Sequence, residues 1–467
     1  MSETYDVAVL GAGSAGYACA LRAAQLGLSV ALVDEAEVGG TCLHRGCIPT
    51  KAWLQAAEVR RTVASASGFG IGAEVGEVDA TRLRTYADGV VSSLHRGLKG
   101  LLASRGVHTI AERGHLVVDE RGPGIELGAK VLRAKAVVLA TGAAPSTLGL
   151  SVDGSRIITS EHALRLDQLP ESAIVLGGGV IGVEFASAWT DLGVRVTLVE
   201  AEERLLPAEE PAHSAVLTRA LAKRGVDIKL GTPIAGATAD DTGVRVRLGD
   251  DELQADVLLV AVGRRPRLDD LGLAEASVEI NGGHIVVDEH LRTSVPGVFA
   301  AGDVVAGPQL AHRGYAHGVF LAEHIAASTG VWPGRPSLPK DHNIARVVYS
   351  SPQLASVGLT RAQAEASGAV EAVSFPLAGN GKALIGHAPG DRETGMVTML
   401  RRPGGEIIGV HVVGDHVAEL IAEGALLVGW QATPDDLTEI IHPHPTLSEA
   451  LGEAAMALGG RGLHIHA

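Results

Sequence analysis

The chain has 467 residues, more than one hydrophobic core normally serves, so we expect about three domains. Hydrophobic residues make up 46% of the chain and charged residues 20%, as in globular proteins, and the formal net charge is −15. This negative balance disfavours nucleic acids and anionic membranes as partners. No apolar run approaches the roughly 18 residues that span a bilayer, and the acidic N-terminal residues do not resemble a signal peptide. We therefore expect a cytoplasmic protein without membrane contact.

The N-terminal region predicts a dinucleotide-binding βαβ unit. An apolar strand at 5–10 leads into the turn Gly11-Ala12-Gly13-Ser14-Ala15-Gly16, a helix to about residue 26 and a second strand at 30–34. Such glycines allow a tight turn, close approach of a pyrophosphate and packing of helix on strand. Asp34 ends the second strand, where its carboxylate can accept hydrogen bonds from a ribose.

The same pattern recurs in the middle of the chain. A strand at 174–176 precedes the turn Gly177-Gly178-Gly179-Val180-Ile181-Gly182, a helix to about residue 192 and a strand at 194–200 that ends in Glu200. One glycine motif of this kind is weak evidence, because glycine-rich turns also occur in unrelated α/β units. Two of them, each between strand and helix and each followed by an acid, predict two dinucleotide sites.

Later strands give the expected domain division. Thr141-Gly142 and Gly263 follow apolar strands, and 298–303 is typical of a late strand that returns to the first domain, with Asp303 at the edge where parallel sheets bind ligands. Beyond residue 338 the pattern changes to an α+β domain, after a proline-rich linker at 333–339. We predict a first domain at 1–145, a second at 146–267, a central segment at 268–337 that completes the first, and a C-terminal domain at 338–467.

Two cysteines, Cys42 and Cys47, lie directly after the first motif. A dithiol beside a nucleotide site suits electron exchange, with a flavin as the carrier between thiols and nicotinamide. In a regular helix these residues rise about 7.5 Å, more than the roughly 4.4–6.8 Å between Cα atoms that a disulfide allows, so we predict a distorted turn at Gly46. Pro49 favours a helix that begins near Cys47, where the helix dipole stabilises a thiolate. Cys47 is then the thiol nearest the flavin, and Cys42 exchanges with substrate.

Other interpretations of the cysteines are weaker. Two structural thiols have no reason to lie so close to the turn, and Cys19, inside a helical pattern, is the thiol expected to pack in a core. A metal site is not expected, because no second pair of Cys or His residues has the spacing of zinc ligands.

Two charged pairs are further candidates. His444 and Glu449 in His442-Pro443-His444-Pro445-Thr446-Leu447-Ser448-Glu449 suit an acid–base dyad for thiol exchange, but Thr446 to Glu449 also reads as a helix capping box. Spacing does not decide between the two interpretations of Glu449.

Lys51 lies one turn after Cys47, and Glu184 lies just past the second glycine turn. They suit a pair that tunes the charge of the flavin, and two solvated charges are the alternative.

The order and spacing of these motifs resemble the flavoprotein pyridine nucleotide–disulfide oxidoreductases, and within that family the dihydrolipoamide dehydrogenases, over essentially the whole chain. The resemblance rests on both glycine turns, Gly-Gly-Thr-Cys-x4-Cys-Ile-Pro-x-Lys at 39–51, Ala-Thr-Gly at 140–142, Val-Gly-Arg-Arg-Pro at 262–266, Ala-Gly-Asp-Val at 301–304, Leu-Ala-His at 310–312 and His-x-His-Pro-Thr-x-Ser-Glu at 442–449. It implies an α/β fold with two Rossmann-like dinucleotide-binding domains, a C-terminal α+β dimerisation domain, FAD at the first site and NAD at the second.

The resemblance also implies roles for individual residues. A homodimer would bring His444 of the partner subunit to the disulfide, so the catalytic residues would be Cys42, Cys47, His444, Glu449, Lys51 and Glu184. The expected cofactor-binding residues are Gly11, Gly13, Ser14, Gly16, Asp34, Gly40, Thr41, Lys51, Gly114, Thr141, Gly142, Asp303 and Ala311, then Gly177, Gly179, Val180, Ile181, Gly182, Glu200 and Gly263.

The expected reaction is oxidation of dihydrolipoamide to lipoamide with NAD⁺, in service of the lipoyl domains of a 2-oxoacid dehydrogenase or glycine-cleavage complex. Glu200, followed by Glu202 and Glu203, favours NAD over NADP because a 2′-phosphate would be repelled. His44-Arg45 stands in place of the usual Asn-Val, and Arg313-Gly314-Tyr315 in place of Lys-Ala-Glu, which leaves substrate identity open. The alternatives are an NAD(P)H-dependent reductase of another low-molecular-weight disulfide and a non-catalytic subunit that keeps the fold.

Overall fold

The computed structural model describes residues 4–387 and 395–465, which form two compact units. Unit 1 comprises Met1–Pro49, Thr85–Ser146 and Arg264–Asp341, and unit 2 comprises Thr50–Arg84, Thr147–Gly263 and His342–Ala467. The segments predicted as a first domain and its central completion thus contribute most of unit 1. No helix in the described part of the chain is long and apolar enough to cross a membrane.

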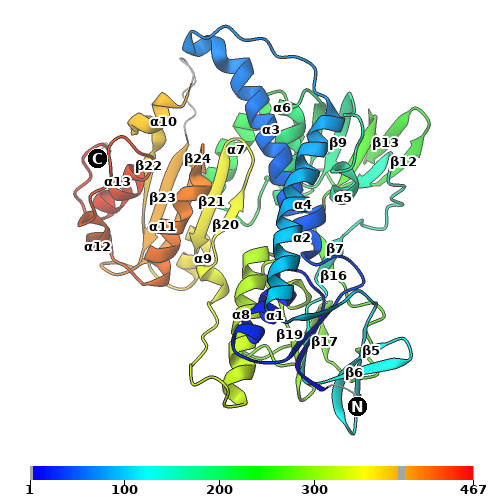
Figure 1. Cartoon of the computed structure of the whole chain (residues 1–467). Helices are drawn as coiled ribbons and strands as arrows, with labels where there is room; N and C mark the ends of the chain where they lie inside the picture. Colours follow the sequence, from blue (N-terminus) through cyan, green and yellow to red (C-terminus); the bar gives the residue numbers. More distant parts are fainter. Residues whose placement is uncertain (1–3, 388–394, 466–467) are drawn as a thin grey trace. The chain divides into compact units, whose positions relative to one another are not determined.

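Unit 1 is built on a seven-stranded sheet in the order β3-β2-β1-β6-β5-β4, with β19 also paired to β6 (Figure 1). The strands are β1 (Thr4–Leu10), β2 (Val30–Val33), β3 (His108–Ile110), β4 (His115–Asp119), β5 (Gly122–Leu127), β6 (Lys130–Leu139) and β19 (Val298–Ala300). The pairs that involve β1, β2, β3 and β19 are parallel, and the last four residues of β1 are all buried, as in a sheet covered on both faces. The predicted return of a late strand at 298–303 is confirmed by β19, which pairs with β6 but ends earlier, at Ala300.

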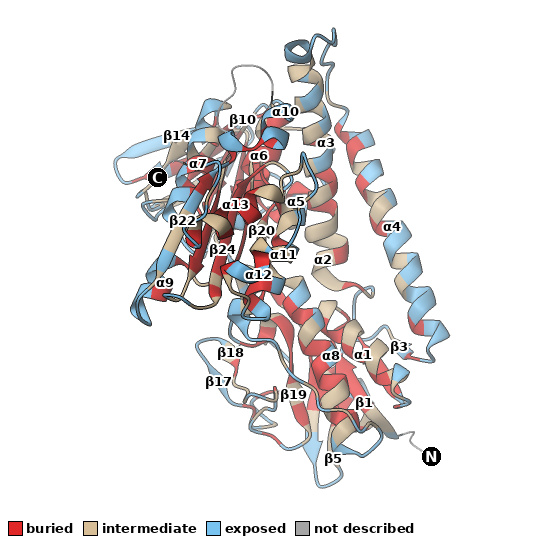
Figure 2. Ribbon diagram, turned by 90° about the vertical axis from the view of Figure 1, so that its left-hand side faces the viewer, coloured by how far each residue is buried: buried red, intermediate tan, exposed pale blue. Residues whose placement is uncertain are grey.

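Two helices of unit 1 pack closely against each other beside this sheet. They are α1 (Ser14–Gln25) and α8 (Ala311–Ser328), which run side by side in Figures 1 and 2. A Cβ added at Gly314 or Gly318 of α8 would lie 2.7 Å from Ser14 Oγ or 2.3 Å from Ala15 O, so glycine permits this approach. Cys19 is fully buried in the same core, as predicted.

The remaining elements of unit 1 are short, apart from two helices that continue into the residue range of unit 2. These are α3 (Cys47–Ser65) and α4 (Ala80–Ser104). The short elements are α2 (Gly40–Arg45), β7 (Ala143–Pro145), β16 (Arg264–Pro266), β17 (Ile280–Asn281), β18 (His284–Ile285) and the 3₁₀ turn η2 (Gly302–Val304).

Unit 2 contains a second parallel sheet, in the order β11-β10-β9-β15-β8. Its strands are β8 (Ile157–Thr159), β9 (Ser172–Leu176), β10 (Arg195–Val199), β11 (Asp227–Lys229) and β15 (Val257–Val260), and its helices are α5 (Ser160–Ala163), α6 (Val180–Asp191) and α7 (Pro211–Lys223). A small antiparallel sheet follows, of β12 (Gly236–Asp240), β13 (Gly243–Leu248) and β14 (Asp251–Ala255). Both predicted βαβ units are therefore confirmed.

The C-terminal part of unit 2 is an antiparallel sheet in the order β20-β21-β24-β23-β22. Its strands are β20 (Arg346–Val348), β21 (Gln353–Gly358), β22 (Glu371–Pro376), β23 (Met396–Arg401) and β24 (Ile407–Gly414). Side chains alternate along β21, where Ala355 and Val357 join the apolar core and Ser356 bonds to Glu209 instead. The predicted change to an α+β pattern is confirmed, because this sheet is antiparallel and its strands occur together with helices.

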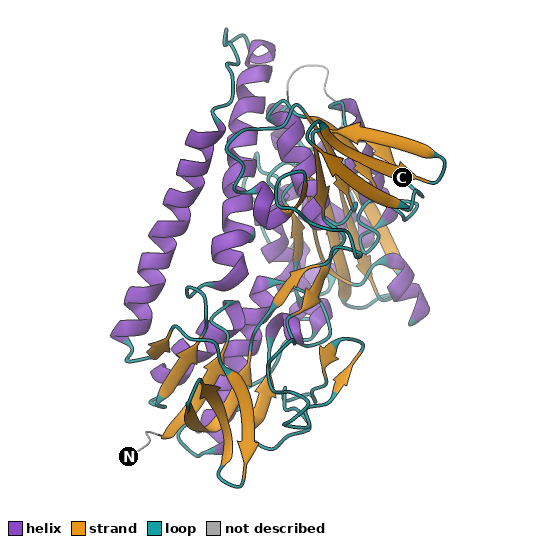
Figure 3. Ribbon diagram, turned by 90° about the vertical axis from the view of Figure 1, so that its right-hand side faces the viewer, coloured by secondary structure: helices purple, strands orange, loops and turns teal. Residues whose placement is uncertain are grey.

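Helices cover the apolar face of this sheet. They are α11 (Val417–Gly429), on β21 and β24, and α13 (Glu449–Leu458), on β22 and β23; α9 (Arg361–Ala366), α10 (Gly381–Ile385) and α12 (Pro434–Thr438) are short. Figure 2 colours much of β24 and α13 as buried, and Figure 3 shows helices and strands mixed throughout the described chain.

Candidate active site

The two glycine turns have the same architecture. Gly11 has φ +103° and Gly177 has φ +108°, and a Cβ would lie 2.3 Å from Ala140 O at the first and 2.5 Å from Ala261 O at the second. At Gly16 and Gly182 a Cβ would lie 1.8 Å from the carbonyl oxygen of the turn's own first glycine. Only glycine therefore fits either end of both turns, for reasons of protein packing alone.

The middle glycines of the turns require another explanation. Gly13 and Gly179 have ordinary φ values of −73° and −75°, and each is the residue before a helix, α1 or α6. A Cβ at Gly179 would meet nothing within 4 Å, and one at Gly13 only the Cα of Gly40 at 4.0 Å. Protein packing does not demand glycine here. A pyrophosphate at the helix N-terminus does, because it needs the backbone exposed, so both turns fit a dinucleotide.

An acid supports each turn. Asp34 Oδ2 accepts a 2.6 Å hydrogen bond from Ala12 N, and Glu200 Oε2 accepts a 2.5 Å bond from Gly178 N. Glu200 Oε1 accepts another bond from Glu202 N at 2.8 Å. Each carboxylate is thus fixed beside its turn, with oxygen lone pairs left for a ligand hydroxyl.

The cysteine segment is attached to the first turn. Gly39 N donates to Ala12 O at 2.8 Å, and a Cβ at Gly40 would lie only 2.6 Å from the Cα of Gly13. Gly39 and Gly40 both have positive φ, at +113° and +60°, which starts α2 directly against the turn. This packing is the reason that a dithiol lies beside a nucleotide-binding turn.

The predicted break between the cysteines is confirmed. Helix α2, which carries Cys42, ends at Arg45, and Gly46 follows with φ −144° and ψ −113°, outside the regions that other residues favour. Helix α3 then begins at Cys47, so this cysteine lies at a helix N-terminus as expected. Both cysteines are half-buried.

Two tyrosines near the cysteines were missed by the sequence analysis. The hydroxyls of Tyr17 on α1 and Tyr315 on α8 are 2.8 Å apart. Burial raises the pKa of both groups, and the charges of Cys42 and Cys47 raise them further, so these sulfur atoms lie within electrostatic range. The tyrosines border a shallow groove of about 420 Å³, lined by Tyr17, Ala18, Leu21, Arg22, Gln25, Tyr315 and Val319. No sequence motif connects two residues that lie 298 positions apart.

Lys51 and Glu184, both in unit 2, form an ion pair. Lys51 Nζ donates to both carboxylate oxygens, at 2.9 and 2.8 Å, and Glu184 also accepts a 3.0 Å bond from Tyr349 N. The Glu184 side chain is only 3% exposed, and the ammonium of Lys51 lies 4.7 Å from the centre of the Tyr349 ring. The interpretation of these residues as two solvated charges is therefore wrong.

His444 and Glu449 also contact each other. His444 Nδ1 lies 2.8 Å from Glu449 Oε1, while Glu449 Oε2 accepts a 2.7 Å bond from Thr446 N. The second bond is not part of a capping box, because α13 begins at Glu449 itself, with Ser448 as its N-cap and no side-chain cap bond, so the capping box predicted from Thr446 to Glu449 is wrong. Burial pushes the pKa of Glu449 up, but the bonds from Thr446 and His444 outweigh it and hold the pKa below its ordinary value. His444 itself is 79% exposed, so its ring is accessible.

A neighbouring His–Glu pair was not expected. His442 Nε2 lies 2.9 Å from Glu423 Oε1 on α11. This contact ties the segment that carries His444 to a helix of the C-terminal core. Only the fold reveals the partner, because 19 residues separate it from the histidine.

In unit 1, η2 carries Asp303. Burial raises the pKa of this carboxyl, although Arg264 and Arg313 oppose the shift. Gly302 N bonds His317 Nδ1 at 3.3 Å, and burial lowers the pKa of His317 to about 4, so the ring is a neutral acceptor. His317 thus supports the backbone next to Asp303, a role that the sequence did not suggest.

The other residues predicted to bind cofactors are placed as follows. Thr141 Oγ1 donates to Arg267 O at 2.8 Å, Gly142 and Gly263 have positive φ, and Ala311 is the first residue of α8. A Cβ at Gly114 would lie 2.6 Å from the Ile125 side chain, so this glycine has a packing role. Ser14, Thr41, Val180 and Ile181 lie in the first turns of α1, α2 and α6.

The predicted site residues divide between the two units. Unit 1 holds both cysteines, the first glycine turn, Asp34, Gly114, Thr141, Gly142, Asp303 and Ala311, and unit 2 holds Lys51, Glu184, the second glycine turn, Glu200, Gly263, His444 and Glu449. Their cofactor and catalytic roles stay predictions.

Known proteins with this organisation provide an independent comparison. The family model for pyridine nucleotide-disulphide oxidoreductases matches residues 5–318, and the model for the dimerisation domain of that family matches 344–455. Dihydrolipoyl dehydrogenases of Bacillus subtilis and Thermus scotoductus are 37% and 40% identical to the chain; each match covers 99% of this chain and at least 99% of the relative.

Solved structures agree with this assignment. LpdA from Mycobacterium tuberculosis superimposes with a TM-score of 0.88 at 28% identity, and the flavoprotein disulfide reductase RclA from Escherichia coli with 0.83 at 26%. Both alignments cover 97% of this chain and 99% of the other. The chain therefore belongs to the pyridine nucleotide-disulphide oxidoreductase family and carries its dimerisation domain.

Proposed function

We propose that this chain is an FAD-containing dihydrolipoyl dehydrogenase, which oxidises dihydrolipoamide to lipoamide and reduces NAD⁺. The observation that carries the proposal is the packing of the cysteine segment on the first glycine turn, with Cys42 and Cys47 on either side of a helix break. Full-length similarity to curated dihydrolipoyl dehydrogenases supports the same assignment.

The chemistry follows from thiol–disulfide exchange. A substrate thiolate attacks Cys42 Sγ of a Cys42–Cys47 disulfide, forms a mixed disulfide and releases Cys47 as thiolate. The second substrate thiol then attacks its own sulfur in the mixed disulfide, which frees lipoamide and leaves Cys42 reduced. FAD, when bound, supplies the chemistry that accepts an electron pair from thiols and returns it as hydride to NAD⁺. The N-terminus of α3 stabilises the Cys47 thiolate once it is released.

Removal of the protons from the substrate thiols requires a base, which the two cysteines do not supply. We assign this role to His444 of the partner subunit, because the exposed His444 ring is held at Nδ1 by Glu449 and leaves Nε2 to take protons from the substrate. The dimerisation domain supports a homodimer in which such a residue is shared. Lys51 and Glu184 would hold fixed charge near the flavin.

The surroundings of Glu200 favour NAD as the acceptor. Its carboxylate accepts hydrogen bonds from two backbone donors, Gly178 N and Glu202 N, and neither donor carries a positive charge. Arg204, the nearest basic residue in sequence, donates instead to Glu209 O at 2.7 Å and to Pro207 O at 2.5 Å. A ribose diol can bond to Glu200, whereas a 2′-phosphate would meet negative charge.

The substrate and its carrier are inferred from the groove that Tyr17 and Tyr315 border. Its wall contains Leu21, Val319 and the ring of Tyr315, which suit the hydrocarbon chain of a lipoyl group, and it also contains the cation of Arg22. We propose lipoyl domains of 2-oxoacid dehydrogenase or glycine-cleavage complexes as partners. A cytoplasmic location fits both these partners and a chemistry that needs its thiols to cycle.

The direct test is steady-state turnover of the FAD-loaded dimer with dihydrolipoamide, comparing NAD⁺ and NADP⁺. The proposal expects ping-pong kinetics and a clear preference for NAD⁺. Absence of NAD⁺-dependent dihydrolipoamide oxidation by protein that retains FAD would refute it.

A second candidate is an NAD(P)H-dependent reductase of another low-molecular-weight disulfide. The specific observation in its favour is the pair His44-Arg45 between the cysteines, because this basic pair suits an anionic substrate. Rates with lipoamide and with anionic low-molecular-weight disulfides separate the two functions. A higher kcat/KM for an anionic disulfide than for lipoamide would favour the second.

A further inference from the structure

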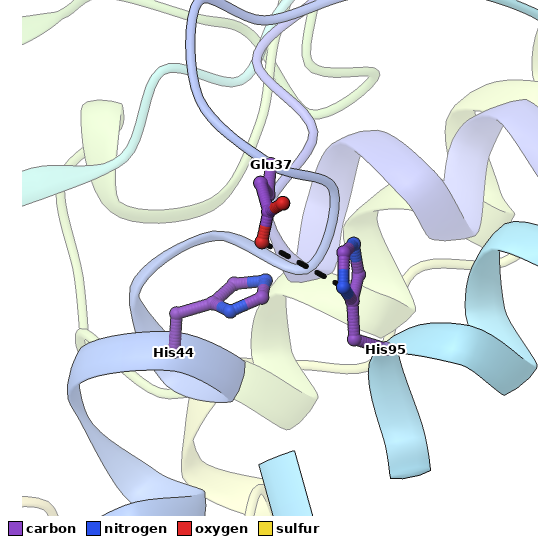
Figure 4. Close-up of side chains that lie close together, drawn as sticks. All are labelled: Glu37, His44 and His95. Carbon is purple, nitrogen blue, oxygen red and sulfur yellow. Dashed lines mark ion pairs between the residues drawn. The ribbon is translucent and has the colours of Figure 1, made fainter. Parts of the chain in front are cut away.

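Three side chains from separate parts of unit 1 converge near the cysteine segment (Figure 4). Glu37 lies in the loop after β2, His44 lies on α2 and His95 lies on α4. One potential ligand atom of each residue lies within 4.8 Å of the others. The family relationship does not explain this group, since His44 occupies a position where the resemblance implies another residue type.

The geometry is close to what a metal ion needs. Ligand atoms at about 2.1 Å from a tetrahedral ion are about 3.4 Å apart. The distances between the three ligand atoms would therefore have to shorten by roughly 1 Å. His95 Nδ1 is already 3.6 Å from Glu37 Oε2, and the Glu37 side chain is 71% exposed and so can adjust. The two imidazole rings lie edge to face with centroids 4.9 Å apart.

Of the two histidines, His44 is fixed by a hydrogen bond. His44 Nε2 lies 2.8 Å from the carbonyl oxygen of Val38, next to Glu37 in the same loop. His95 Nε2 is buried and has no hydrogen-bond partner within the described residues. Burial lowers the pKa of His95, with Glu37 opposing the shift and His44 and Lys99 adding to it.

The donor set indicates the kind of ion. Two imidazoles and one carboxylate suit zinc and copper, whereas magnesium and calcium prefer oxygen ligands alone. Three protein ligands leave a position for water, and the exposed Glu37 provides an entry path. We propose that Glu37, His44 and His95 form a binding site for one divalent transition-metal ion of the Zn²⁺ or Cu²⁺ class, separate from the redox cysteines.

Such an ion would join α2 to α4. Because α2 carries both Cys42 and His44, binding would fix the helix that presents the substrate-facing thiol. The inference about the metal does not depend on the reaction that this thiol performs.

The test is metal binding by the tag-free, FAD-loaded dimer in which both redox cysteines are replaced, Cys42→Ser and Cys47→Ser, so that thiols contribute nothing. Zn²⁺ affinity is measured by competition with a chromogenic chelator. Cu²⁺ is added separately, and its electron paramagnetic resonance spectrum reports nitrogen ligands. The proposal expects one ion per chain and coupling to two nitrogens.

Variants then locate the ion. His95→Gln or His44→Asn should weaken Zn²⁺ binding about 100-fold and remove one nitrogen coupling, and Glu37→Gln should weaken it less. The matched control is His464→Gln, which removes another histidine from a carboxylate pair, here with Glu453 at 2.6 Å. FAD content and Tm verify that each variant is folded.

The result that supports the proposal is loss of binding in the His44 and His95 variants alone. Binding that survives His95→Gln and His44→Asn, or that disappears with His464→Gln, would overturn it. Absence of stoichiometric Zn²⁺ binding at about 100 μM total metal, far above the affinity that a three-ligand zinc site should reach, would overturn it as well.

Discussion

Replacement of Glu449 by glutamine isolates the contribution of one carboxylate to the proposed base. The side-chain oxygen of the new amide can still accept the 2.7 Å bond from Thr446 N, so the loop before α13 should keep its conformation. The change removes the charge of the carboxylate that lies 2.8 Å from His444 Nδ1. The substitution therefore acts on the histidine and only weakly on the fold.

The magnitude follows from the type of bond. A hydrogen bond to a charged group contributes about 1.5–3 kcal/mol, and the 79% exposure of His444 and 28% exposure of Glu449 place this pair at the lower end. A loss of about 1.5 kcal/mol in the transition state lowers kcat/KM for dihydrolipoamide about tenfold.

The assay compares two complete reactions, of which only one passes through the thiols. Dihydrolipoamide oxidation with NAD⁺ requires the base, whereas NADH oxidation by an artificial electron acceptor such as ferricyanide bypasses the thiols. Only the first rate should fall in Glu449→Gln. The control is Glu453→Gln on the same helix, which removes the charge beside His464 and should leave both rates unchanged. Equal dihydrolipoamide rates in the Glu449 and Glu453 variants would refute the assignment of His444 and Glu449 as a dyad.

Three other predictions concern unit 2. Glu184→Gln removes the charge that accepts two bonds from Lys51. Since Lys51 is 32% exposed, we expect the free energy of unfolding to fall by only about 1–3 kcal/mol, seen in calorimetry as a Tm lower by several degrees. An unchanged Tm would contradict a stabilising pair. Glu200→Gln should raise the NADP⁺ to NAD⁺ ratio of kcat/KM about tenfold, and an unchanged ratio would contradict the role of this carboxylate. Burial lowers the pKa of His213 to about 3, below its value near 6.5 in the unfolded chain. The unfolded state therefore takes up the proton first, and stability falls as the pH drops from 6.5 toward 3. The Tm should decline as the pH is lowered from about 7.5 to about 4.5, and a constant Tm would be inconsistent with this burial.

Local sequence predicted much of the fold, because the relevant interactions are local. Gly11 and Gly16 are needed for backbone contacts within one βαβ unit, and Gly46 ends α2 by its own conformation. Pro49, whose ring favours the first turn of a helix, was sufficient to predict that α3 begins at Cys47.

Contacts between distant segments could not be predicted in the same way. Tyr17 meets Tyr315 only because Gly314 and Gly318 let α8 approach α1, and Glu37, His44 and His95 converge only through tertiary packing. Glu449 shows a third case, in which its carboxylate bonds to both Thr446 N and His444, but α13 begins only at Glu449, so the local pattern predicted the helix start too early.

The central claim is that electrons from the substrate pass through Cys42 and Cys47. Anaerobic mixing of dihydrolipoamide with FAD-loaded wild type, Cys42→Ser and Cys47→Ser, followed by flavin absorbance, tests it most directly. The account predicts that the wild-type flavin spectrum changes within one turnover, while both variants keep FAD, still react with NADH and show no response to dihydrolipoamide. A dihydrolipoamide-dependent change at the wild-type rate in either variant would contradict the claim.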